Sequence, residues 1–458
     1  MAKQKTIFIT ISKDIMRRNI LDTKFWPKVQ HDNPEAKFIL IVEDDKVDFF
    51  NDTYGTPNVS ARGLQRFRKG RMWNLAKFGV RTALTSHSAK RYRMQAYELG
   101  EATLVSTLIK TFIYNFLAPN LWYKKFVRWF LMKFMKAPQI EKLFDDEKPD
   151  LVFAPSMIDN DFDIPVAAES KRRGVRVVGM VRSWDNMTSH SLLGTKPDRM
   201  LHQNKFLKSV AVGKYQEISE REHGPMDIVG LPHYDLYKDP TQHIMPKEEY
   251  FKEKGLDPNK KLIFVAGSQL YRHGYILPVV FDNLIESGEI KSPAQVLFRP
   301  HPKPMFPMEK YKLETTKNIV LDKGSQSKVR FSDTQNFINA LYHSDVVIGV
   351  SSTITIDSAV FGKPCVDINF DDPNTKIGYW ASVKRLFDTE DHYERVMELR
   401  DKRIATSPDE LAQYINEYLA DPSLGEEGRK AIMKEFVEPF DGNAGERLAD
   451  IITKEIQK

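Results

Sequence analysis

The chain has 458 residues, of which 41% are hydrophobic and 28% are charged, and its net charge is +6. This balance excludes an intrinsically disordered chain and is typical of a soluble globular protein. The length exceeds what one hydrophobic core usually supports, so we expect two lobes. The single cysteine, Cys365, excludes an internal disulfide and a zinc site built from cysteines.

The expected cellular location follows from two segments. The N-terminus leads into an apolar run at Thr6 without the long apolar region and small-residue cleavage site of a signal peptide. The longest charge-free apolar segment, Thr111–Tyr123, is too short to span a bilayer. We therefore expect a cytoplasmic protein, with peripheral attachment to the inner face of the cell membrane as an open alternative.

Apolar runs that alternate with helical patterns predict a parallel sheet in a first lobe, residues 1–240. The predicted strands are Thr6–Ile11, Phe38–Val42, Asp150–Pro155, Val175–Val181, Arg199–His202 and Asp227–Gly230. A short helix is expected at Val166–Arg173. Residues 53–136 interrupt this alternation and are interpreted as a basic, aromatic helical insert.

A second alternation follows the polar, proline-containing stretch Pro240–Lys261, which predicts the inter-lobe connection. Its expected strands are Leu262–Ala266, Val296–Phe298, Ile319–Leu321 and Val346–Val350, with a helix at Thr334–His343 and a further strand after Gly362. This second lobe is assigned to residues 241–425. Helices over 426–458 could pack back on the first lobe. The predicted fold is α/β, with two doubly wound lobes and a ligand cleft at the carboxyl ends of their strands.

The strongest functional signal is the proline-rich segment that follows the predicted strand ending at Phe298. It reads Arg-Pro-His-Pro-Lys-Pro, and its three prolines fix φ and stiffen the loop. Arg299, His301 and Lys303 are therefore expected at the edge of the sheet on a stiff loop, which would lose little conformational entropy when a ligand binds. Such a cluster suits the phosphates of a nucleotide. A rigid basic turn without a ligand is the alternative.

A second signal lies about fifty residues later, where Ser351, Ser352 and Thr353 follow a predicted strand and begin a helix. Hydroxyls and free backbone N–H groups at such a position can bind an anion. Asp357, one turn further along the helix, could accept hydrogen bonds from ribose hydroxyls. A simple helix cap is the alternative for the serines. Gly267 and Ser268 follow another strand, where either a close approach of backbone to phosphate or an ordinary turn would explain them.

These two segments resemble the HP and Ser-Ser/Thr motifs of nucleotide-dependent GT-B transferases, including bacterial sialyl- and Kdo-type transferases and the CDP-glycerol glycerophosphotransferase group. The run from Asp357 to Pro364 resembles the Glu-Ala-x-x-x-Gly-Lys-Pro stretch of the same superfamily, with Asp in place of Glu. The resemblance implies two Rossmann-like lobes. It also implies that His301 contacts the donor phosphate, that Ser351, Ser352 and Thr353 share the diphosphate, and that Asp357 holds the ribose.

Transfer to a hydroxyl acceptor needs a general base, and the first lobe offers carboxylates and a histidine after its predicted strands. The candidates are Asp159, Asp161, Asp185 and His233. The Ser-Trp-Asp-Asn run at 183–186 and the Gly-x-Pro-x-x-Asp run at 230–235 resemble the same bacterial subgroup, which implies that they face the cleft. Helix capping by Asp185 and by Asp163 is the alternative.

We expect no resident cofactor and no required metal, because the basic loop at His301 can neutralise a diphosphate by itself. Two acidic clusters, Glu43-Asp44-Asp45 and Asp371-Asp372, follow strands and could hold a divalent ion. Neither forms an Asp-x-Asp run, and both are interpreted as exposed loop acids.

Positive charge is concentrated between Thr53 and Lys136, which contain sixteen Lys or Arg residues and two acids. Within this insert, Leu121–Lys136 carries five basic and six aromatic residues and no acid. As a helix it would fit the surface of an anionic membrane. A core helix with a solvated basic edge is the alternative. Binding of nucleic acid is not expected, because the sequence contains no RNA-binding signature and the net charge is modest.

The leading functional hypothesis is a glycosyltransferase that moves a sugar from a nucleotide-activated donor to a glycan or lipid-linked acceptor in cell-surface polysaccharide synthesis. A CDP-glycerol-type polyol-phosphate transferase would use the same phosphate site. A UDP-sugar epimerase and a non-catalytic nucleotide or RNA binder are further alternatives. The basic insert favours a large or membrane-bound acceptor, which an epimerase does not need.

Overall fold

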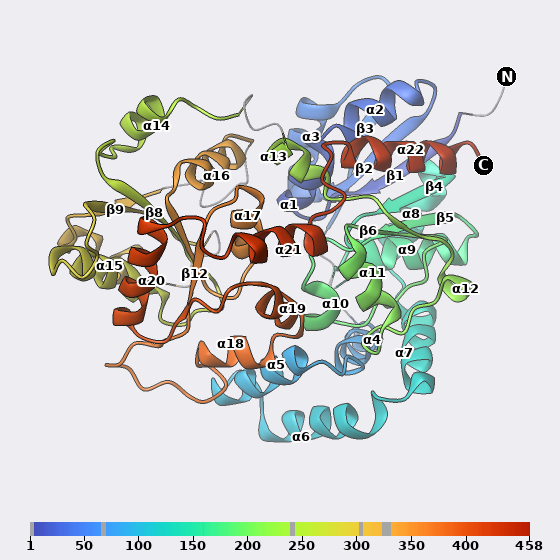
Figure 1. The fold of residues 1–458 in the computed structure, drawn as a ribbon. Helices are drawn as coiled ribbons and strands as arrows, with labels where there is room; N and C mark the ends of the chain where they lie inside the picture. Colours follow the sequence, from blue (N-terminus) through green and yellow to red (C-terminus); the bar gives the residue numbers. More distant parts are fainter. Residues whose placement is uncertain (1–3, 66–69, 159, 239–242, 302–305, 323–330) are drawn as a thin grey trace. The chain divides into compact units, whose positions relative to one another are not determined.

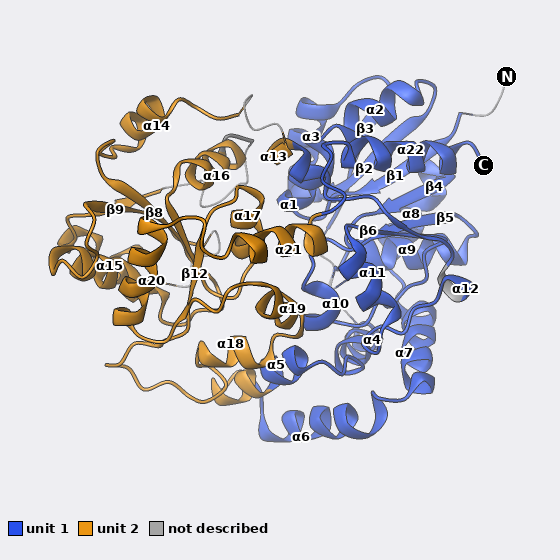
Figure 2. Cartoon of the chain, in the orientation of Figure 1, with its two compact units in different colours: residues 1–93, 102–235, 438–458 blue, residues 94–101, 236–437 orange. Residues whose placement is uncertain are grey.

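The computed structural model describes residues 4–65, 70–158, 160–238, 243–301, 306–322 and 331–458 (Figure 1). The chain forms two compact units, each built around one parallel sheet (Figure 2). Unit 1 comprises residues 1–93, 102–235 and 438–458, and unit 2 comprises residues 94–101 and 236–437. The sequence predicted lobe boundaries at residues 240 and 425, and the corresponding boundaries between the two units of the structure lie at residues 235 and 437.

The sheet of unit 1 has seven strands in the order β3-β2-β1-β4-β5-β6-β7, and every neighbouring pair is parallel. The strands are β1 (Thr6–Thr10), β2 (Lys37–Glu43), β3 (Val59–Leu64), β4 (Leu151–Ala154), β5 (Arg176–Met180), β6 (Arg199–His202) and β7 (Met226–Ile228). Each strand predicted for the first lobe is confirmed, with ends that differ by one or two residues. In strand order 3-2-1-4-5, two halves run outward from β1, which is the doubly wound arrangement.

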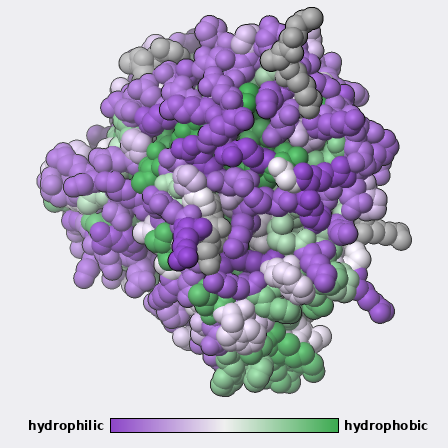
Figure 3. Space-filling view, turned by 90° about the vertical axis from the view of Figure 1, so that its right-hand side faces the viewer, coloured by the Kyte–Doolittle hydropathy of each residue, from purple (hydrophilic) through white to green (hydrophobic). Residues whose placement is uncertain are grey.

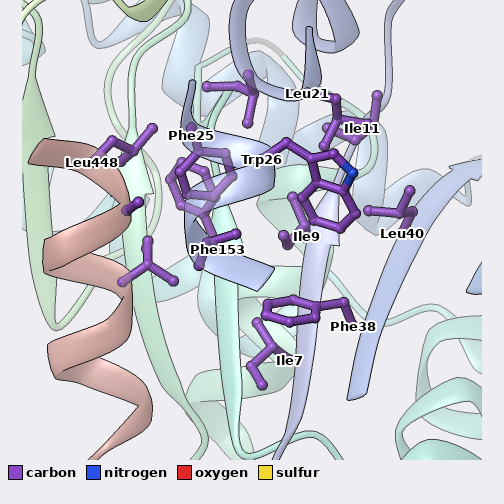
Figure 4. Close-up of a cluster of buried hydrophobic side chains, with 14 of the residues drawn as sticks. Ile7, Ile9, Ile11, Leu21, Phe25, Trp26, Phe38, Leu40, Phe153 and Leu448 are labelled. Atoms are coloured by element: carbon purple, nitrogen blue, oxygen red, sulfur yellow. The ribbon is translucent and has the colours of Figure 1, made fainter. Parts of the chain in front are cut away.

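Alternate residues of β1 point to opposite faces of this sheet, and both faces are covered. Ile7 and Ile9 join a buried cluster with Phe25 of helix α2 (Phe25–Asp32) and Leu448 of helix α22 (Ala444–Ile456) (Figure 4). Phe8 points the other way, where its ring meets that of Phe144 of helix α8 (Pro138–Glu147) edge-on, with 5.3 Å between the ring centroids. Burial on both faces explains why the strands are short, continuous apolar runs.

Helices of unit 1 connect these strands and cover the two faces. Their bounds are α1 (Asp14–Met16), α2 (Phe25–Asp32), α3 (Val47–Tyr54), α4 (Arg71–Thr82), α5 (His87–Glu98), α6 (Leu104–Phe112), α7 (Leu121–Phe134), α8 (Pro138–Glu147), α9 (Asp163–Arg172), α10 (Asn186–Ser189), α11 (Lys205–Val212), α12 (Glu220–His223) and α22 (Ala444–Ile456). Residues 94–98 of α5 are assigned to unit 2. Short π-helical turns are η1 (Arg17–Leu21) and η3 (Ile113–Leu117), and 3₁₀ turns are η2 (Asp44–Lys46) and η4 (Pro232–Tyr234).

The sheet of unit 2 has six strands in the order β10-β9-β8-β11-β12-β13, again parallel throughout. The strands are β8 (Lys261–Ala266), β9 (Ala294–Arg299), β10 (Ile319–Leu321), β11 (Val346–Gly349), β12 (Cys365–Ile368) and β13 (Ile404–Ala405). The four predicted strands are confirmed, as is the strand after Gly362. β13, a strand of two residues, was not predicted from the sequence.

Helices of unit 2 also lie on both faces of their sheet. Their bounds are α13 (Asp235–Lys238), α14 (Lys247–Lys254), α15 (Leu277–Glu286), α16 (Phe331–His343), α17 (Ile354–Val360), α18 (Lys384–Thr389), α19 (Asp391–Leu399), α20 (Pro408–Ala420) and α21 (Glu426–Phe436), with 3₁₀ turns η6 (Gly274–Ile276), η7 (Met308–Tyr311) and η8 (Leu313–Thr315). Ile263 and Val265 of β8 face a cluster that includes Phe281 of α15. Leu262 and Phe264 face the opposite cluster, with Tyr250 of α14.

The basic insert differs from its prediction at its start. Val59–Leu64 is strand β3, which pairs with β2 along its whole length and forms the edge of the sheet. Arg62 of this strand is held by Glu147, with 2.6 Å between Nε and Oε1. The helical part begins at Arg71 and contains α4 to α7. Among the described residues, no helix combines the length and apolar character that crossing a membrane requires.

Candidate active site

The loops that follow β8 and β9 touch through their backbones at the carboxyl edge of the second sheet. The Gly267 N–H donates to the Arg299 carbonyl oxygen at 2.8 Å. A Cβ atom on Gly267 would lie 2.9 Å from the His301 nitrogen and 3.1 Å from the Arg299 oxygen. The absence of a side chain at Gly267 is therefore what lets the His301 loop lie against this turn.

The Arg299 guanidinium already has an anionic partner in the described structure. Its Nε donates to Asp322 Oδ2 at 2.7 Å, and Nη2 pairs with the same carboxylate oxygen. The cation also lies 5.3 Å from the ring centroid of Phe337. A bidentate contact between Arg299 and phosphate stays a prediction, and it requires the guanidinium to leave Asp322. Lys303, the other predicted cation of this loop, lies outside the described residues.

Ser351, two residues beyond the end of β11, combines a rare backbone conformation with an unpaired hydroxyl. Its φ is +37°, which places a side-chain-bearing residue in the left-handed region at a cost of about 1–3 kcal/mol. The residue is 2% exposed, and its Oγ has no hydrogen-bond partner among the described residues. Burying a hydroxyl without a partner costs further free energy. Such a combination is typical of a residue whose partner is a ligand.

The remaining predicted phosphate and ribose residues follow β11 or β8 in the chain. Ser352 is half-buried, Thr353 is exposed at the residue before α17, and Asp357 is 7% exposed within that helix. Ser268, after β8, uses its Oγ to accept the Leu270 N–H at 3.2 Å. Thr353 and Asp357 are one turn apart, as predicted, since the Asp357 N–H donates to the Thr353 oxygen at 2.9 Å.

A buried polar cluster that sequence reasoning missed anchors α17 to β12. Thr355 Oγ1 and the Tyr393 hydroxyl are 2.8 Å apart, and that hydroxyl donates to Asp367. Arg400 pairs with Asp367 and donates to the Cys365 carbonyl oxygen at 2.6 Å. Burial and the Asp367 charge raise the pKa of Tyr393 well above its usual value. The cluster holds the start of α17, and with it Thr353 and Asp357, against the sheet.

Polar groups also meet at the carboxyl edge of the first sheet, around the fully buried Asp163. Its carboxylate accepts hydrogen bonds from Thr10 Oγ1 at 2.7 Å, Ser12 Oγ at 3.2 Å and the Ser156 N–H at 2.9 Å. Burial raises the pKa of Asp163 to about 6, against the effect of these bonds and of the Arg182 charge. Asp163 is the first residue of α9 and ties the ends of β1 and β4 together. The capping alternative noted from the sequence is wrong for Asp163, because Phe162 stands at the cap position and these hydrogen bonds come from outside α9.

Two of the candidate bases lie near this edge with partners of their own. Asp161 is ion-paired with Lys77 of the basic insert, with 2.7 Å between Oδ1 and Nζ. The Asp185 carboxylate accepts the Ser189 hydroxyl at 3.3 Å and lies 3.7 Å from His190 Nδ1. Asp185 stands at the residue before α10, as its capping alternative predicts, but its side chain makes no capping hydrogen bond to that helix. Asp159 lies outside the described residues.

His233 lines a small pocket at this edge together with Arg182, Gln203 and Asn19. Burial, with a contribution from the nearby Arg18 charge, holds the pKa of His233 well below 6.5. Its Nδ1 has no hydrogen-bond partner among the described residues. Asp235, two residues later, instead caps α22: its carboxylate accepts the N–H groups of Ala444 at 3.0 Å and Gly445 at 2.8 Å.

The paired acids Asp371 and Asp372 accept hydrogen bonds from nearby residues of the loop that follows β12. Asp371 is part-buried and accepts the Ser382 hydroxyl at 2.6 Å and the Val383 N–H at 3.1 Å. It is therefore not the exposed loop acid that was predicted. Asp372 accepts the Asn374 N–H at 2.9 Å and the Thr375 hydroxyl at 2.8 Å.

Comparisons with known proteins show which sequences and structures this chain is similar to. No family model matches the chain. Over 310 residues it is 26% identical to lipid-A-disaccharide synthase of Geobacter sulfurreducens, which covers 65% of this chain and 73% of that protein. The structure is similar to UDP-GlcNAc 2-epimerase from Neisseria meningitidis bound to UDP-GlcNAc, with a TM-score of 0.53, 11% identity, and coverage of 99% of this chain and 100% of that one. It is also similar to a variant of the wall teichoic acid polymerase TagF, with a TM-score of 0.50, 12% identity, and coverage of 99% and 89%.

The chain has a GT-B-like fold. In that fold the Gly267 turn, the His301 loop and Ser351 follow β8, β9 and β11, three strands that are neighbours in the order β9-β8-β11. Sequence motifs found these three segments. Asp322, Asp367 and Arg400 were missed, because a lone charged residue has no local sequence pattern that reveals its partner.

Proposed function

We propose that this protein is a glycosyltransferase that takes a glycosyl group from a nucleoside-diphosphate donor and passes it to a glycan or lipid-linked acceptor in cell-surface polysaccharide synthesis. The observation that carries the proposal is Ser351, strained, buried and without a partner for its hydroxyl among the described residues. It lies at the same sheet edge as the backbone contact between Gly267 and His301.

A diphosphate would supply the hydrogen-bond partner that the Ser351 hydroxyl lacks among the described residues. The Ser351 hydroxyl would donate to a phosphate oxygen, and the free energy of this hydrogen bond would offset the cost of burying the hydroxyl and the strain of its backbone. His301 would add a donor from the neighbouring loop, where Gly267 permits close approach of the backbone. Ser352 and Thr353 would offer further hydroxyls, and Asp357 would bind the ribose. In this proposal these residues bind the donor without a resident cofactor.

The general base is proposed among the carboxylates of the first sheet edge. A base works best when its pKa is near the working pH, and the pKa of His233 is held well below 6.5. This disfavours His233 as the group that removes the acceptor proton. Asp161 would have to exchange Lys77 for the acceptor hydroxyl, and Asp185 would have to release Ser189. Asp159 completes the set of candidates.

The comparisons support a nucleotide-activated donor. The Geobacter sulfurreducens relative is named for a synthase reaction that builds a disaccharide, and the Neisseria meningitidis structure holds UDP-GlcNAc. The second candidate is a CDP-glycerol-type polyol-phosphate transferase, which the likeness to TagF favours. An epimerase would use the donor without an acceptor. The identity of the nucleotide and the need for an acceptor therefore separate the three activities.

Thermal unfolding with UDP, CDP, CMP, GDP and their sugar or glycerol conjugates tests the donor site. A ligand present at a hundred times its Kd stabilises the folded protein by about 2.7 kcal/mol, which is readily measured. We expect one nucleotide class to raise the Tm, and Ser351→Ala and His301→Ala each to reduce that response. Ser287→Ala is the matched control, because Ser287 precedes β9 at the opposite edge of the same sheet.

A response that persists in the Ser351→Ala/His301→Ala double variant would contradict the site. Product analysis then separates the activities. A sugar transferred from a nucleotide-sugar to an added glycan or lipid acceptor supports the proposal. Phosphoglycerol transferred from CDP-glycerol supports the second candidate. Conversion of the nucleotide-sugar without any acceptor would identify an epimerase.

A further inference from the structure

An exposed apolar surface covers one side of α6, η3 and α7 in unit 1. Its most exposed members include Val105, Leu108, Phe112, Phe116, Trp122 and Trp129, which we call the α6–α7 apolar face. Their exposed fractions run from 52% for Trp129 to 67% for Val105. In Figure 3, hydrophobic residues gather at the lower end of the view, where Figure 1 draws α6. Contiguous apolar surface of this kind marks an interaction site.

The opposite side of α7 is packed rigidly into unit 1. Tyr123, Val127 and Leu131 are buried in a cluster with residues of α4. Lys124 donates from Nζ to the Lys214 carbonyl oxygen at 2.7 Å, and Arg128 donates from Nε to the Leu193 carbonyl oxygen at 3.0 Å. Two of the five basic residues of the predicted interfacial helix thus point inward and anchor it. The aromatic residues that remain outside are therefore presented on a fixed platform.

Positive charge accompanies this face. From Ala102 to Ile140 the sequence has six Lys or Arg residues and neither Asp nor Glu. Lys125, Lys133 and Lys136 are exposed along α7 and just beyond it. The Lys133 ammonium lies 5.0 Å from the ring centroid of Trp129, so charge and apolar surface alternate on one helix. Tryptophan beside lysine suits the boundary between acyl chains and headgroups, with the lysines reaching toward lipid phosphates.

We propose that the α6–α7 apolar face docks this protein onto an anionic lipid surface. The apolar side chains would enter the headgroup region while the exposed lysines meet the negative surface charge. A second copy of this chain would fit the apolar side chains but would bring two sets of exposed lysines together. This like-charge repulsion is why the structure favours lipid over self-association. The inference concerns unit 1 alone and stands apart from the donor site.

Vesicle flotation of the full chain tests the proposal, without nucleotide. The vesicles are phosphatidylcholine alone or phosphatidylcholine mixed with phosphatidylglycerol. We expect wild type to float with the anionic vesicles and much less with the neutral ones. Binding to anionic vesicles should fall about tenfold or more in Trp122→Ser/Trp129→Ser and in Phe112→Ser/Phe116→Ser, because exposed apolar anchors are lost. Lys133→Glu/Lys136→Glu should weaken it by at least about fivefold per charge.

The control is Tyr379→Ser, which removes an aromatic ring that is 60% exposed in unit 2 and should float like wild type. Circular dichroism shows whether each variant is folded. The nucleotide-induced change in Tm reports on the donor site alone, so a failure of the proposed donor site can be told apart from a failure to bind lipid. The proposal is overturned if wild type does not bind anionic vesicles, if it binds neutral vesicles equally well, or if the apolar variants float like wild type. A wild-type dimer that Trp122→Ser/Trp129→Ser converts to a monomer, without vesicle binding, would overturn it in favour of self-association.

Discussion

Replacement of Gly267 by alanine tests the close approach of two loops on which the proposed phosphate site depends. The added Cβ would lie 2.9 Å from the His301 nitrogen, 3.1 Å from the Arg299 oxygen and 3.2 Å from the Pro300 Cα. All three are backbone atoms, so no side chain can turn aside. The two loops must separate by about 0.5 Å to restore ordinary contact, at a cost of about 1–3 kcal/mol in the free energy of unfolding.

The same displacement moves His301 away from the Gly267 turn, so we expect Gly267→Ala to weaken nucleotide binding about tenfold. The assays are titration calorimetry with the nucleotide that raises the Tm, and urea unfolding for stability. Gly274→Ala is the matched control, because its new Cβ would meet Tyr271 at an ordinary 3.6 Å. If Gly267→Ala binds nucleotide as tightly as wild type, the close approach of the two loops has no part in donor binding and the reasoning is refuted.

Three further substitutions probe charges outside the proposed phosphate site, each by urea unfolding. Burial raises the pKa of Asp163 from an ordinary 3.8 to about 6, so the folded state holds this proton more tightly than the unfolded state does. The free energy of unfolding of wild type, relative to that of Asp163→Asn, should therefore be greatest below pH 4. It should fall by about 3 kcal/mol as the pH rises to 7. A pH-independent difference would contradict this. Asp235→Ala should cost about 1 kcal/mol through the lost cap of α22 and leave the nucleotide response unchanged, whereas a lost response at full stability would assign Asp235 to the site. Arg400→Ala should cost about 3–5 kcal/mol because it leaves Asp367 charged and buried, and a loss below 1 kcal/mol would show that the pair is dispensable.

The basic insert shows where pattern and packing diverge. The sequence predicted α7 correctly as an aromatic helix, because its hydrophobic residues recur at helical spacing. It did not show that Lys124 and Arg128 point inward, since their partners are backbone carbonyl oxygens at Lys214 and Leu193. A carbonyl oxygen is present at every residue, so no sequence pattern marks the one that a buried cation will choose.

Local pattern was sufficient for the strands that lie inside each sheet. β1 and β8 are buried on both faces and must be short, continuous apolar runs, which the sequence shows directly. Of the four edge strands, β7 and β10 were predicted, whereas β3 and the two-residue β13 were missed. β3, with its internal Arg62 and Gly63, resembles a loop until β2 supplies its hydrogen bonds.

The sequence by itself determined the two-lobed α/β fold and marked the segments proposed for a phosphate site, because both depend on short-range patterns of apolar residues, prolines and hydroxyls. Only the tertiary structure decided what individual side chains do. It paired Arg299 with Asp322, joined Asp235 to α22, and left the Ser351 hydroxyl buried without a described partner. The physical reason is that a charge or a hydroxyl acts on whatever group folding brings within about 3 Å of it, and that group can lie anywhere in the chain.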